Sequence, residues 1–193
     1  MNQLIFATGN AHKAHEIEQI LAGQFSIKTM SEIGQTEDIP ETELTIEGNA
    51  RLKARFLKEK FGVDCFSEDT GLEVFSLNGA PGVNTARYAG EEKNPAANIA
   101  LLLNNLKPNK KRDAQFRTVI CLIIKGKEYI FEGICPGKIA LLPMGNGGFG
   151  YDPVFIPKGR RRTFAQLPES VKNKISHRGL ATEKMRAFLL HQV

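Results

Sequence analysis

Residues 67–87 read SEDTGLEVFSLNGAPGVNTAR, and the acidic pair Glu68 and Asp69 stands near the start of this stretch. Residues 63–67 (VDCFS) have the β-branched and aromatic composition of a short buried strand. The sequence therefore predicts that both carboxylates lie where a strand runs into a Thr-Gly turn. Adjacent carboxylates repel one another unless a cation lies between them, and their oxygens suit Mg²⁺. A solvated turn capped by Asp69 is the alternative for this motif taken alone.

Composition indicates a compact protein that is not exported. The chain has 193 residues, 41% of them hydrophobic, which is enough for one large domain or two small lobes. No stretch approaches the ~18 apolar residues of a membrane span, and the N-terminus lacks the basic and apolar regions of a signal peptide. The three cysteines are far apart and predict neither a disulfide framework nor a zinc cluster. We therefore expect a cytoplasmic protein without a membrane partner.

The basic residues bunch in two runs, at 107–112 (KPNKKR) and 158–162 (KGRRR), and the formal net charge of the chain is +5. Nucleic-acid-binding segments commonly interleave aromatic side chains with the charges, and neither run contains an aromatic residue. We therefore interpret both runs as solvated loops and expect no nucleic acid partner. A nucleic-acid-binding module that uses these runs is the alternative from a different functional class.

A second motif follows the first predicted strand, at 3–7 (QLIFA). Thr8, Gly9 and Asn10 form a tight turn before a helix predicted near 11–22. The free N–H groups at a helix N-terminus and the helix dipole favour an anion. Lys13 falls in the first turn, where a cation is unfavourable unless an anion lies between it and the dipole. The pattern fits a phosphate site and also an ordinary capped helix.

An acidic connection, 31–43, leads to a helix predicted at 45–61. The proline before Glu41 fixes the local backbone, so Glu41 is better placed than its acidic neighbours to reach a site. On the helix, Lys53 falls on or beside the apolar face. Because this helix runs directly into the strand before Glu68, we favour a polar pocket around Lys53 over a side chain that extends past the core into solvent.

The order of predicted elements changes after the first 106 residues. Residues 114–125 and 127–136 predict a long hairpin, whereas the preceding chain alternates strands and helices. A cleft between two lobes is a usual place for a small-molecule site. We therefore predict a single domain of two lobes, with lobe 1 made of about 1–106 and 161–193 and lobe 2 of about 107–160.

Two later motifs complete the candidate site. The glycine-rich stretch 145–152 (GNGGFGYD) allows the backbone to approach a ligand while it presents an aromatic face, although a flexible hairpin tip has the same composition. His177 and Arg178 fall in the first turn of the last predicted helix, with Ser176 as its N-cap. Together with Lys13 they place cations at helix N-termini, which suggests one shared polyanion.

Taken in order, these motifs closely resemble the inosine triphosphate pyrophosphatase family, also called Ham1-like proteins. The matching pieces are Thr8-Gly9-Asn10-x-x-Lys13, Glu68-Asp69-Thr70-Gly71-Leu72, Gly79-Ala80-Pro81-Gly82, Gly148-Phe149-Gly150-Tyr151-Asp152-Pro153 and Lys172 with Ile175-Ser176-His177-Arg178. The resemblance spans nearly the whole chain. It implies an α/β fold of two lobes, with an elongated mixed β-sheet flanked by helices and a central cleft. It also implies Mg²⁺-dependent hydrolysis of the non-canonical purine nucleotides ITP, dITP and XTP to the monophosphate and pyrophosphate, which protects DNA and RNA, and a homodimer.

The resemblance further implies a role for each matching residue. Asp69 would bind Mg²⁺ and act as the general base, with Glu41 and Glu68 completing the metal site. The phosphates would be held by Thr8, Gly9, Asn10, Lys13 and Lys53, with Thr70 beside them, and the base by Phe149, Gly150, Tyr151, Asp152, Lys172, His177 and Arg178. The runner-up enzyme is a Maf-like pyrophosphatase that acts on modified pyrimidine nucleotides.

The chain departs from the family's pattern in three places. Gln166 replaces a common Glu, Ser170 and Val171 replace an acidic pair, and Gly48 stands where many members have Glu. These departures leave the expected reaction intact. We therefore assign no supporting role to an acid at any of these positions.

Overall fold

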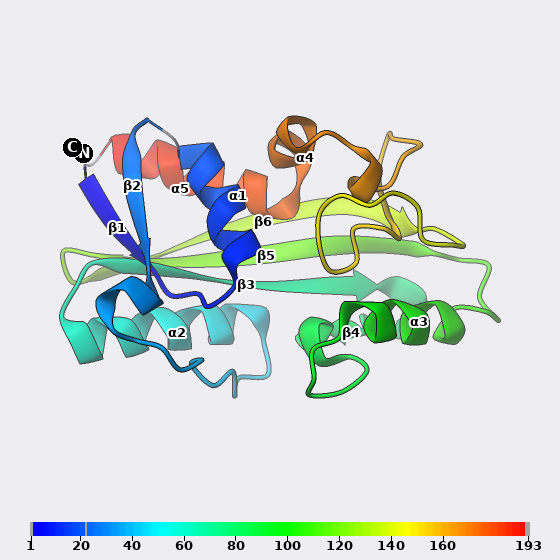
Figure 1. Cartoon of the computed structure of the whole chain (residues 1–193), viewed down its shortest axis with the longest axis horizontal. Coiled ribbons are helices and arrows are strands. Elements are labelled where there is room, and N and C mark those ends of the chain that lie inside the picture. The colour runs from blue at the N-terminus through cyan, green and yellow to red at the C-terminus, as the bar shows by residue number, and fades with distance from the viewer. Residues whose placement is uncertain (1, 22, 192–193) are drawn as a thin grey trace. The chain divides into compact units, whose positions relative to one another are not determined.

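The computed structural model describes residues 2–21 and 23–191, and their contacts group into two compact units. Unit 1 consists of Met1–Asp69, Thr118–Gly133 and His177–Val193, and unit 2 of Thr70–Arg117 and Ile134–Ser176. The long strands β3 (Cys65–Val74), β5 (Asp113–Ile124) and β6 (Lys127–Ile139) contribute residues to both units (Figure 1).

The unit boundaries fall inside strands, not in the loops where the sequence suggested lobe boundaries. Residues 70–106, which we had placed in lobe 1, group with 134–176. The physical reason is that each long strand packs its two ends into different cores. Phe66 and Ile120 belong to the core of unit 1, whereas Leu72 and Phe116 belong to that of unit 2.

Unit 1 is built on a sheet with the strand order β2-β1-β3-β5-β6, in which β1 pairs in parallel with both β2 and β3. Helices α1 and α5 pack against one another on one face, and α2 covers the other (Figure 1). The stacked rings of Phe6 and Phe66, 4.4 Å apart, lie in the core beneath α1 and α5. The remaining elements of this unit are β1 (Asn2–Phe6), α1 (Ala11–Leu21), β2 (Phe25–Thr29), η1 (Met30–Ile33), α2 (Ile46–Phe61) and α5 (His177–Leu190).

Strand β3 does not turn after Asp69, so the predicted Thr-Gly turn is wrong. The strand continues to Val74, because Leu72 and Val74 are fully buried in the core of unit 2 and hold the chain extended. Its side chains alternate between the two faces of the sheet. Cys65 and Ser67 donate hydrogen bonds to carbonyls of α2, whereas Phe66 packs under α1 and α5.

Unit 2 uses the other ends of the long strands, with β4 antiparallel to β3 and β7 antiparallel to β6. The rings of Phe116, Phe155 and Phe164 pack together in its core. Asn94 caps α3, because its side chain accepts hydrogen bonds from the first free N–H groups of that helix. The remaining elements are η2 (Phe75–Leu77), β4 (Pro81–Gly82), η3 (Thr85–Arg87), α3 (Pro95–Asn105), β7 (Phe155–Pro157), η4 (Phe164–Gln166) and α4 (Glu169–Ile175).

The predicted α/β class is confirmed, since a mixed sheet with helices packed on it forms the structure. The helix predicted at 11–22 is observed at Ala11–Leu21, and that at 45–61 is observed at Ile46–Phe61. Among the described residues, no helix has the length and apolar character that crossing a membrane requires.

Candidate active site

Glu68 lies at the centre of a buried charge cluster in unit 1. It accepts two hydrogen bonds from the guanidinium of Arg178, from Nε at 2.8 Å and from Nη2 at 3.0 Å. The ammonium of Lys13 lies 2.7 Å from the same carboxylate, and Arg178 also donates from Nη1 to Glu16 at 2.6 Å. Two acids and two cations therefore neutralise one another between α1, α5 and β3.

The ion pairs of this cluster keep its members in their charged forms. Burial alone would raise the pKa of Glu68, but Arg178 and Lys13 outweigh it and hold that pKa well below its usual range. Burial would likewise lower the pKa of Arg178, but Glu68 and Glu16 raise it. Arg178 is therefore the partner of two protein carboxylates, and its contact with a base stays a prediction.

Glu16 is the member of this cluster that sequence reasoning missed. It is 5% exposed and lies three residues after Lys13, so both side chains share one face of α1. The only sequence signal was its place beside Ile17 in the apolar stripe of the helix. An acid in that position requires a buried partner, and the partner, Arg178, is 162 residues away in the chain.

Asp69 belongs to a second cluster, on the side of β3 that faces α2. Lys53 of α2 donates to Oδ1 of Asp69 at 3.2 Å and to Oε1 of Glu41 at 2.6 Å. The acidic segment is attached to the same helix, because the Glu43 N–H donates to Oδ1 of Asn49 at 3.0 Å. Lys53 therefore has polar partners inside the fold instead of extending into solvent, as expected, and Glu41 is one of them.

The two sides of this ion pair titrate differently from free side chains. Burial disfavours the charged ammonium, but Asp69 and Glu41 outweigh it and raise the pKa of Lys53. Burial also raises the pKa of Asp69, against the opposing effects of Lys53 and Lys13. Asp69 is thus a carboxylate that holds a proton more readily than usual, beside a lysine that keeps its charge.

The second oxygen of Asp69, Oδ2, is buried and lacks a hydrogen-bond donor among the described residues. A buried carboxylate oxygen without a donor is costly, and a hard cation would satisfy it. The oxygens of Glu41 and Glu68 have the same chemistry, so the donor set fits Mg²⁺. Within residues 2–21 and 23–191, however, no three potential ligands are already grouped around one point, since Glu68 and Asp69 lie on opposite faces of β3.

The predicted turn at Thr8, Gly9 and Asn10 is present before α1. The Asn10 N–H donates to Oγ1 of Thr8, and Oδ1 of Asn10 accepts from the Lys13 N–H, both at 3.1 Å. A side chain at position 9 would come within 2.9 Å of the carboxylate of Asp38. The turn and the helix N-terminus are therefore confirmed, and phosphate binding there stays a prediction.

In unit 2, Asp152 and Lys172 form a buried ion pair 2.5 Å apart. Oδ2 of Asp152 also accepts from the Phe149 N–H at 2.9 Å, and the ammonium of Lys172 lies 4.9 Å from the centroid of the Phe149 ring. Gly148 has a φ of +69°, and a Cβ there would fall 2.0 Å from the Asp152 carboxylate. The glycine-rich stretch is therefore folded around this carboxylate.

The other residues of the predicted site divide between the units. Tyr151 is 4% exposed and packs in the core of unit 2, where its hydroxyl donates to the Thr85 carbonyl at 3.0 Å, and burial raises its pKa. Gly150, with a φ of +59°, and half-buried Thr70 also lie in unit 2. His177 is buried at the first position of α5 in unit 1. Their contacts with a substrate stay predictions.

Comparisons with known proteins agree with this arrangement of motifs. Residues 4–188 match the Ham1 family. The chain is 53% identical over 191 residues to a dITP/XTP pyrophosphatase of Porphyromonas gingivalis, covering 98% of each chain. It is 51% identical over 183 residues to a dITP/XTP pyrophosphatase of Flavobacterium johnsoniae, covering 95% of each.

Solved structures show the same fold. The Ham1 protein of Staphylococcus aureus is 37% identical, with a TM-score of 0.90 over the full length of both chains. The HAM1 protein of Coxiella burnetii is 35% identical, with a TM-score of 0.90 over 99% of this chain and 100% of that one.

Proposed function

Because the chain belongs to the Ham1 family, we propose that it hydrolyses the purine nucleoside triphosphates ITP, dITP and XTP to the monophosphate and pyrophosphate. Relatives of about half identity that are named dITP/XTP pyrophosphatases support this activity. The single observation that carries the mechanism is Oδ2 of Asp69, which is buried and has no partner among the described residues. Such an activity keeps deaminated purines out of DNA and RNA.

Asp69 is the general base of this proposal. It would accept the proton of the water that attacks phosphorus, and the burial that raises its pKa makes it a stronger base than a free aspartate. The contact of Lys53 with Oδ1 holds the carboxylate, and the unpartnered Oδ2 is the oxygen that is available to the metal ion or to the proton of the attacking water.

Magnesium is the proposed cofactor, with Asp69 and Glu41, which meet at Lys53, as its protein ligands. Glu68 was the third ligand expected from the sequence, but it lies on the other face of β3 and pairs with Arg178 and Lys13, so we leave it out of the proposed metal site. When bound there, Mg²⁺ would neutralise triphosphate charge and lower the pKa of a coordinated water. Lys53 and Lys13 occupy these carboxylates in the structure. Both lysines are cations that a triphosphate attracts, so substrate can draw them toward its phosphates and expose carboxylate oxygens.

The phosphates are assigned to the turn before α1 and its neighbours. Thr8, Gly9 and Asn10 precede the helix N-terminus, where backbone N–H groups favour an anion. Lys13 and Lys53 would offset the charge that builds on the leaving pyrophosphate. Thr70 directly follows Asp69 in β3, which suits a contact with the phosphates.

The base is assigned to Phe149, Gly150, Tyr151, Asp152, Lys172, His177 and Arg178. A 6-keto purine offers an acceptor where adenine has an amino group, so the ammonium of Lys172 or a backbone N–H near Asp152 would distinguish them. A buried donor without a partner costs about 1–3 kcal/mol, so a few such donors give strong discrimination.

We also propose that the protein is a cytoplasmic homodimer. The described cysteines are buried and unpaired, and burial raises the pKa of Cys65 to about 12, which fits structural thiols in a reducing compartment.

Light scattering in solution would test the dimer: we expect twice the 21.4 kDa mass of one chain. A single-chain mass at micromolar concentration would refute it.

A steady-state assay tests the function directly. ITP, XTP, ATP, GTP and a modified pyrimidine triphosphate are compared at equal concentration, with Mg²⁺ and with EDTA, and both phosphate products are measured. We expect pyrophosphate from ITP and XTP, little turnover of ATP, and no turnover in EDTA; GTP, which carries the same 6-keto oxygen, shows whether that oxygen alone is recognised. Orthophosphate as the first product would indicate a different triphosphatase, and preference for the modified pyrimidine would indicate the Maf-like activity.

A further inference from the structure

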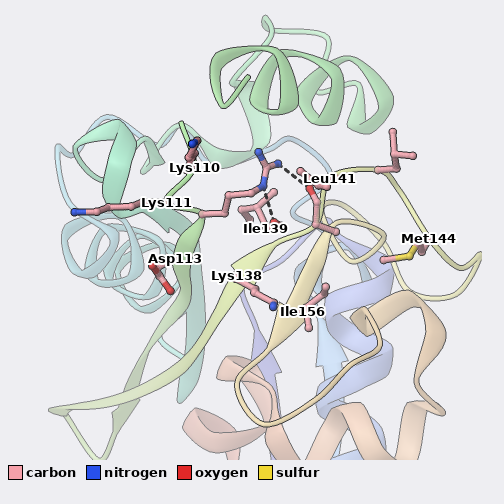
Figure 2. A pocket seen from close by; sticks show the side chains of 11 residues that line it. Lys110, Lys111, Asp113, Lys138, Ile139, Leu141, Met144 and Ile156 are labelled. Atoms are coloured by element: carbon pink, nitrogen blue, oxygen red, sulfur yellow. Dashed lines mark hydrogen bonds between the residues drawn. The ribbon is translucent and has the colours of Figure 1, made fainter. Parts of the chain in front are cut away.

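Two adjoining hollows on unit 2 bring together the two basic runs of the sequence. The larger has a volume of about 700 Å³ and is lined by Lys110 and Lys111 of the first run (Figure 2). The smaller has a volume of about 370 Å³ and is lined by Lys158 and Arg160 of the second. The hollows share Lys138, whose side chain lies beside Ile156 in Figure 2. These five cations define what we call the basic face.

Both runs are attached to the same end of β6. The guanidinium of Arg112 donates to the carbonyl oxygens of Ile139 at 2.8 Å and Ala140 at 2.7 Å. In the second run, the Lys158 N–H donates to the carbonyl oxygen of Pro136 at 2.8 Å. Arg112 therefore has a structural role, because it attaches the first run to β6. The Lys158 N–H attaches the second run to the same strand, so both sets of cations lie near its end.

The basic face also contains an exposed aromatic ring. Phe75, at the start of η2, is 56% exposed and lines the smaller hollow with Lys138 and Lys158. Neither basic run contains an aromatic residue, which was the reason to expect no nucleic acid partner. The fold supplies the ring from a different segment, so that reason no longer holds.

We propose that the basic face of unit 2 binds single-stranded nucleic acid. Among the residues that line the two hollows, these five cations are balanced by a single carboxylate, that of Asp113. The excess of positive charge strongly favours a polyanion. A single strand exposes both its phosphates and the faces of its bases, and Phe75 offers a stacking surface beside the charges. A duplex hides those faces, which is why the ring favours a single strand.

This site goes beyond the proposed hydrolysis, because it uses no residue assigned to that reaction. Binding at this site would keep an enzyme that hydrolyses deaminated purine nucleotides near nucleic acid. The larger hollow also carries the exposed apolar side chains of Leu141 and Met144, which an acidic protein segment could cover. The exposed ring and the excess of cations favour the strand, and the protein segment becomes an outcome of the test.

Binding of a fluorescent single-stranded DNA of about 16 nucleotides, followed by anisotropy, tests the proposal, because that length is the upper end of the about 4–16 nucleotides that one OB fold binds. Each phosphate contact contributes a slope of about −0.7 to the dependence of log affinity on log salt. Five contacts predict a slope of about −3.5, so affinity should fall about 100-fold between 50 and 200 mM salt. The full-length protein is used, and ITP turnover is measured in parallel.

Three variants separate the parts of the site. Lys138→Glu combined with Lys158→Glu should abolish measurable binding, and Phe75→Leu should weaken it by about 5-fold or more without changing the salt slope. Lys93→Glu changes an exposed lysine of unit 2 outside both hollows and should have little effect. All of these proteins should keep wild-type ITP turnover, so loss of binding is distinguishable from loss of fold.

Several results would overturn the proposal. These are no binding by the wild type, equal binding by the lysine double variant, and an unchanged affinity in Phe75→Leu. Binding of a mononucleotide or a duplex as tightly as the single strand would also overturn it. Displacement of the DNA by polyglutamate at equal charge concentration would indicate an acidic protein partner instead.

Discussion

Glu68 and Asp69 are consecutive residues of β3, yet their carboxylates belong to different ion-pair clusters. Glu68 accepts from Nε of Arg178 at 2.8 Å, whereas Asp69 accepts from Lys53 at 3.2 Å. Successive side chains of a strand face opposite sides of a sheet, so one acid faces α1 and α5 and the other faces α2. One strand thus carries an acid whose oxygens are all paired and an acid with one oxygen available for chemistry.

Asp69→Asn should lower kcat for ITP by at least ~10²-fold, because a general base contributes that much and an amide cannot accept the proton. Pyrophosphate release measures the effect, and circular dichroism should show a retained fold. Asp64→Asn is the matched control, since Asp64 lies just before β3 and binds Lys58 and Lys125. Normal turnover by Asp69→Asn would remove this residue from the mechanism.

Glu68→Gln should lower the free energy of unfolding by about 3–5 kcal/mol, because it leaves the buried guanidinium of Arg178 without one of its carboxylates and takes the same partner from half-buried Lys13. Urea denaturation measures the change. Glu47→Gln removes a half-exposed partner of Arg51 and should cost less than about 1 kcal/mol. Equal effects of the two variants would mean that the buried cluster adds no stability.

The same cluster predicts how stability depends on pH. The pKa of Glu68 is lower in the folded protein than its ordinary value of 4.5, because Arg178 and Lys13 outweigh the effect of burial. Its stabilising contribution is therefore complete above pH 4.5 and is lost as pH falls toward the folded pKa. In metal-free protein, the difference in unfolding free energy between wild type and Glu68→Gln should shrink as pH falls below 4.5. A difference that grows on acidification would contradict this sign.

Lys53→Met should raise the pKa of Asp69 further. Burial already raises it, and Lys53 is the strongest influence that holds it down. The carboxyl ¹³C signal of Asp69, followed by NMR in metal-free protein, reports the titration directly. Lys58→Met, on the same helix but paired with Asp64, is the control and should leave it unchanged. An unmoved titration in Lys53→Met would mean that the two groups do not interact.

Lys172→Met should reduce the preference for ITP over ATP. If its ammonium donates to the 6-keto oxygen, losing it costs about 1–3 kcal/mol, or roughly 5- to 150-fold in the ratio of kcat/KM values. Lys174→Met changes an exposed lysine of the same helix and should preserve the ratio. A ratio that survives in Lys172→Met would leave Lys172 with the structural task of pairing with Asp152.

Local patterns predicted most elements but not where β3 ends. The glycine after Thr70 was interpreted as a turn signal, yet Leu72 and Val74 bury themselves in a second core and keep the strand straight. The same long strands explain why the two compact units differ in their bounds from the predicted lobes. Periodicity reports which face of an element is buried, but it does not report that one strand serves two cores.

The sequence motifs predicted the charged residues around Asp69, but they did not predict every residue that packs or pairs with the functional side chains. Lys53, Glu41 and Asp69 converge as expected. Glu16 was missed because an acid on a helix is usually solvated, and Arg178, which pairs with it in the interior, is 162 positions away in the sequence. Phe75 was missed for a similar reason, since the cations around it come from other segments.

The pairing of Glu68 with Arg178 has a consequence for biosynthesis. The two residues are separated by 110 positions, so the ribosome adds Glu68 long before Arg178, and Lys13 is the one of its two cationic partners already synthesised. Until that arginine emerges, a carboxylate destined for the interior must stay hydrated, and α5 cannot close over it. Unit 1 should therefore mature only at the end of translation, and nascent chains stalled before Arg178 should remain sensitive to protease across their first 69 residues.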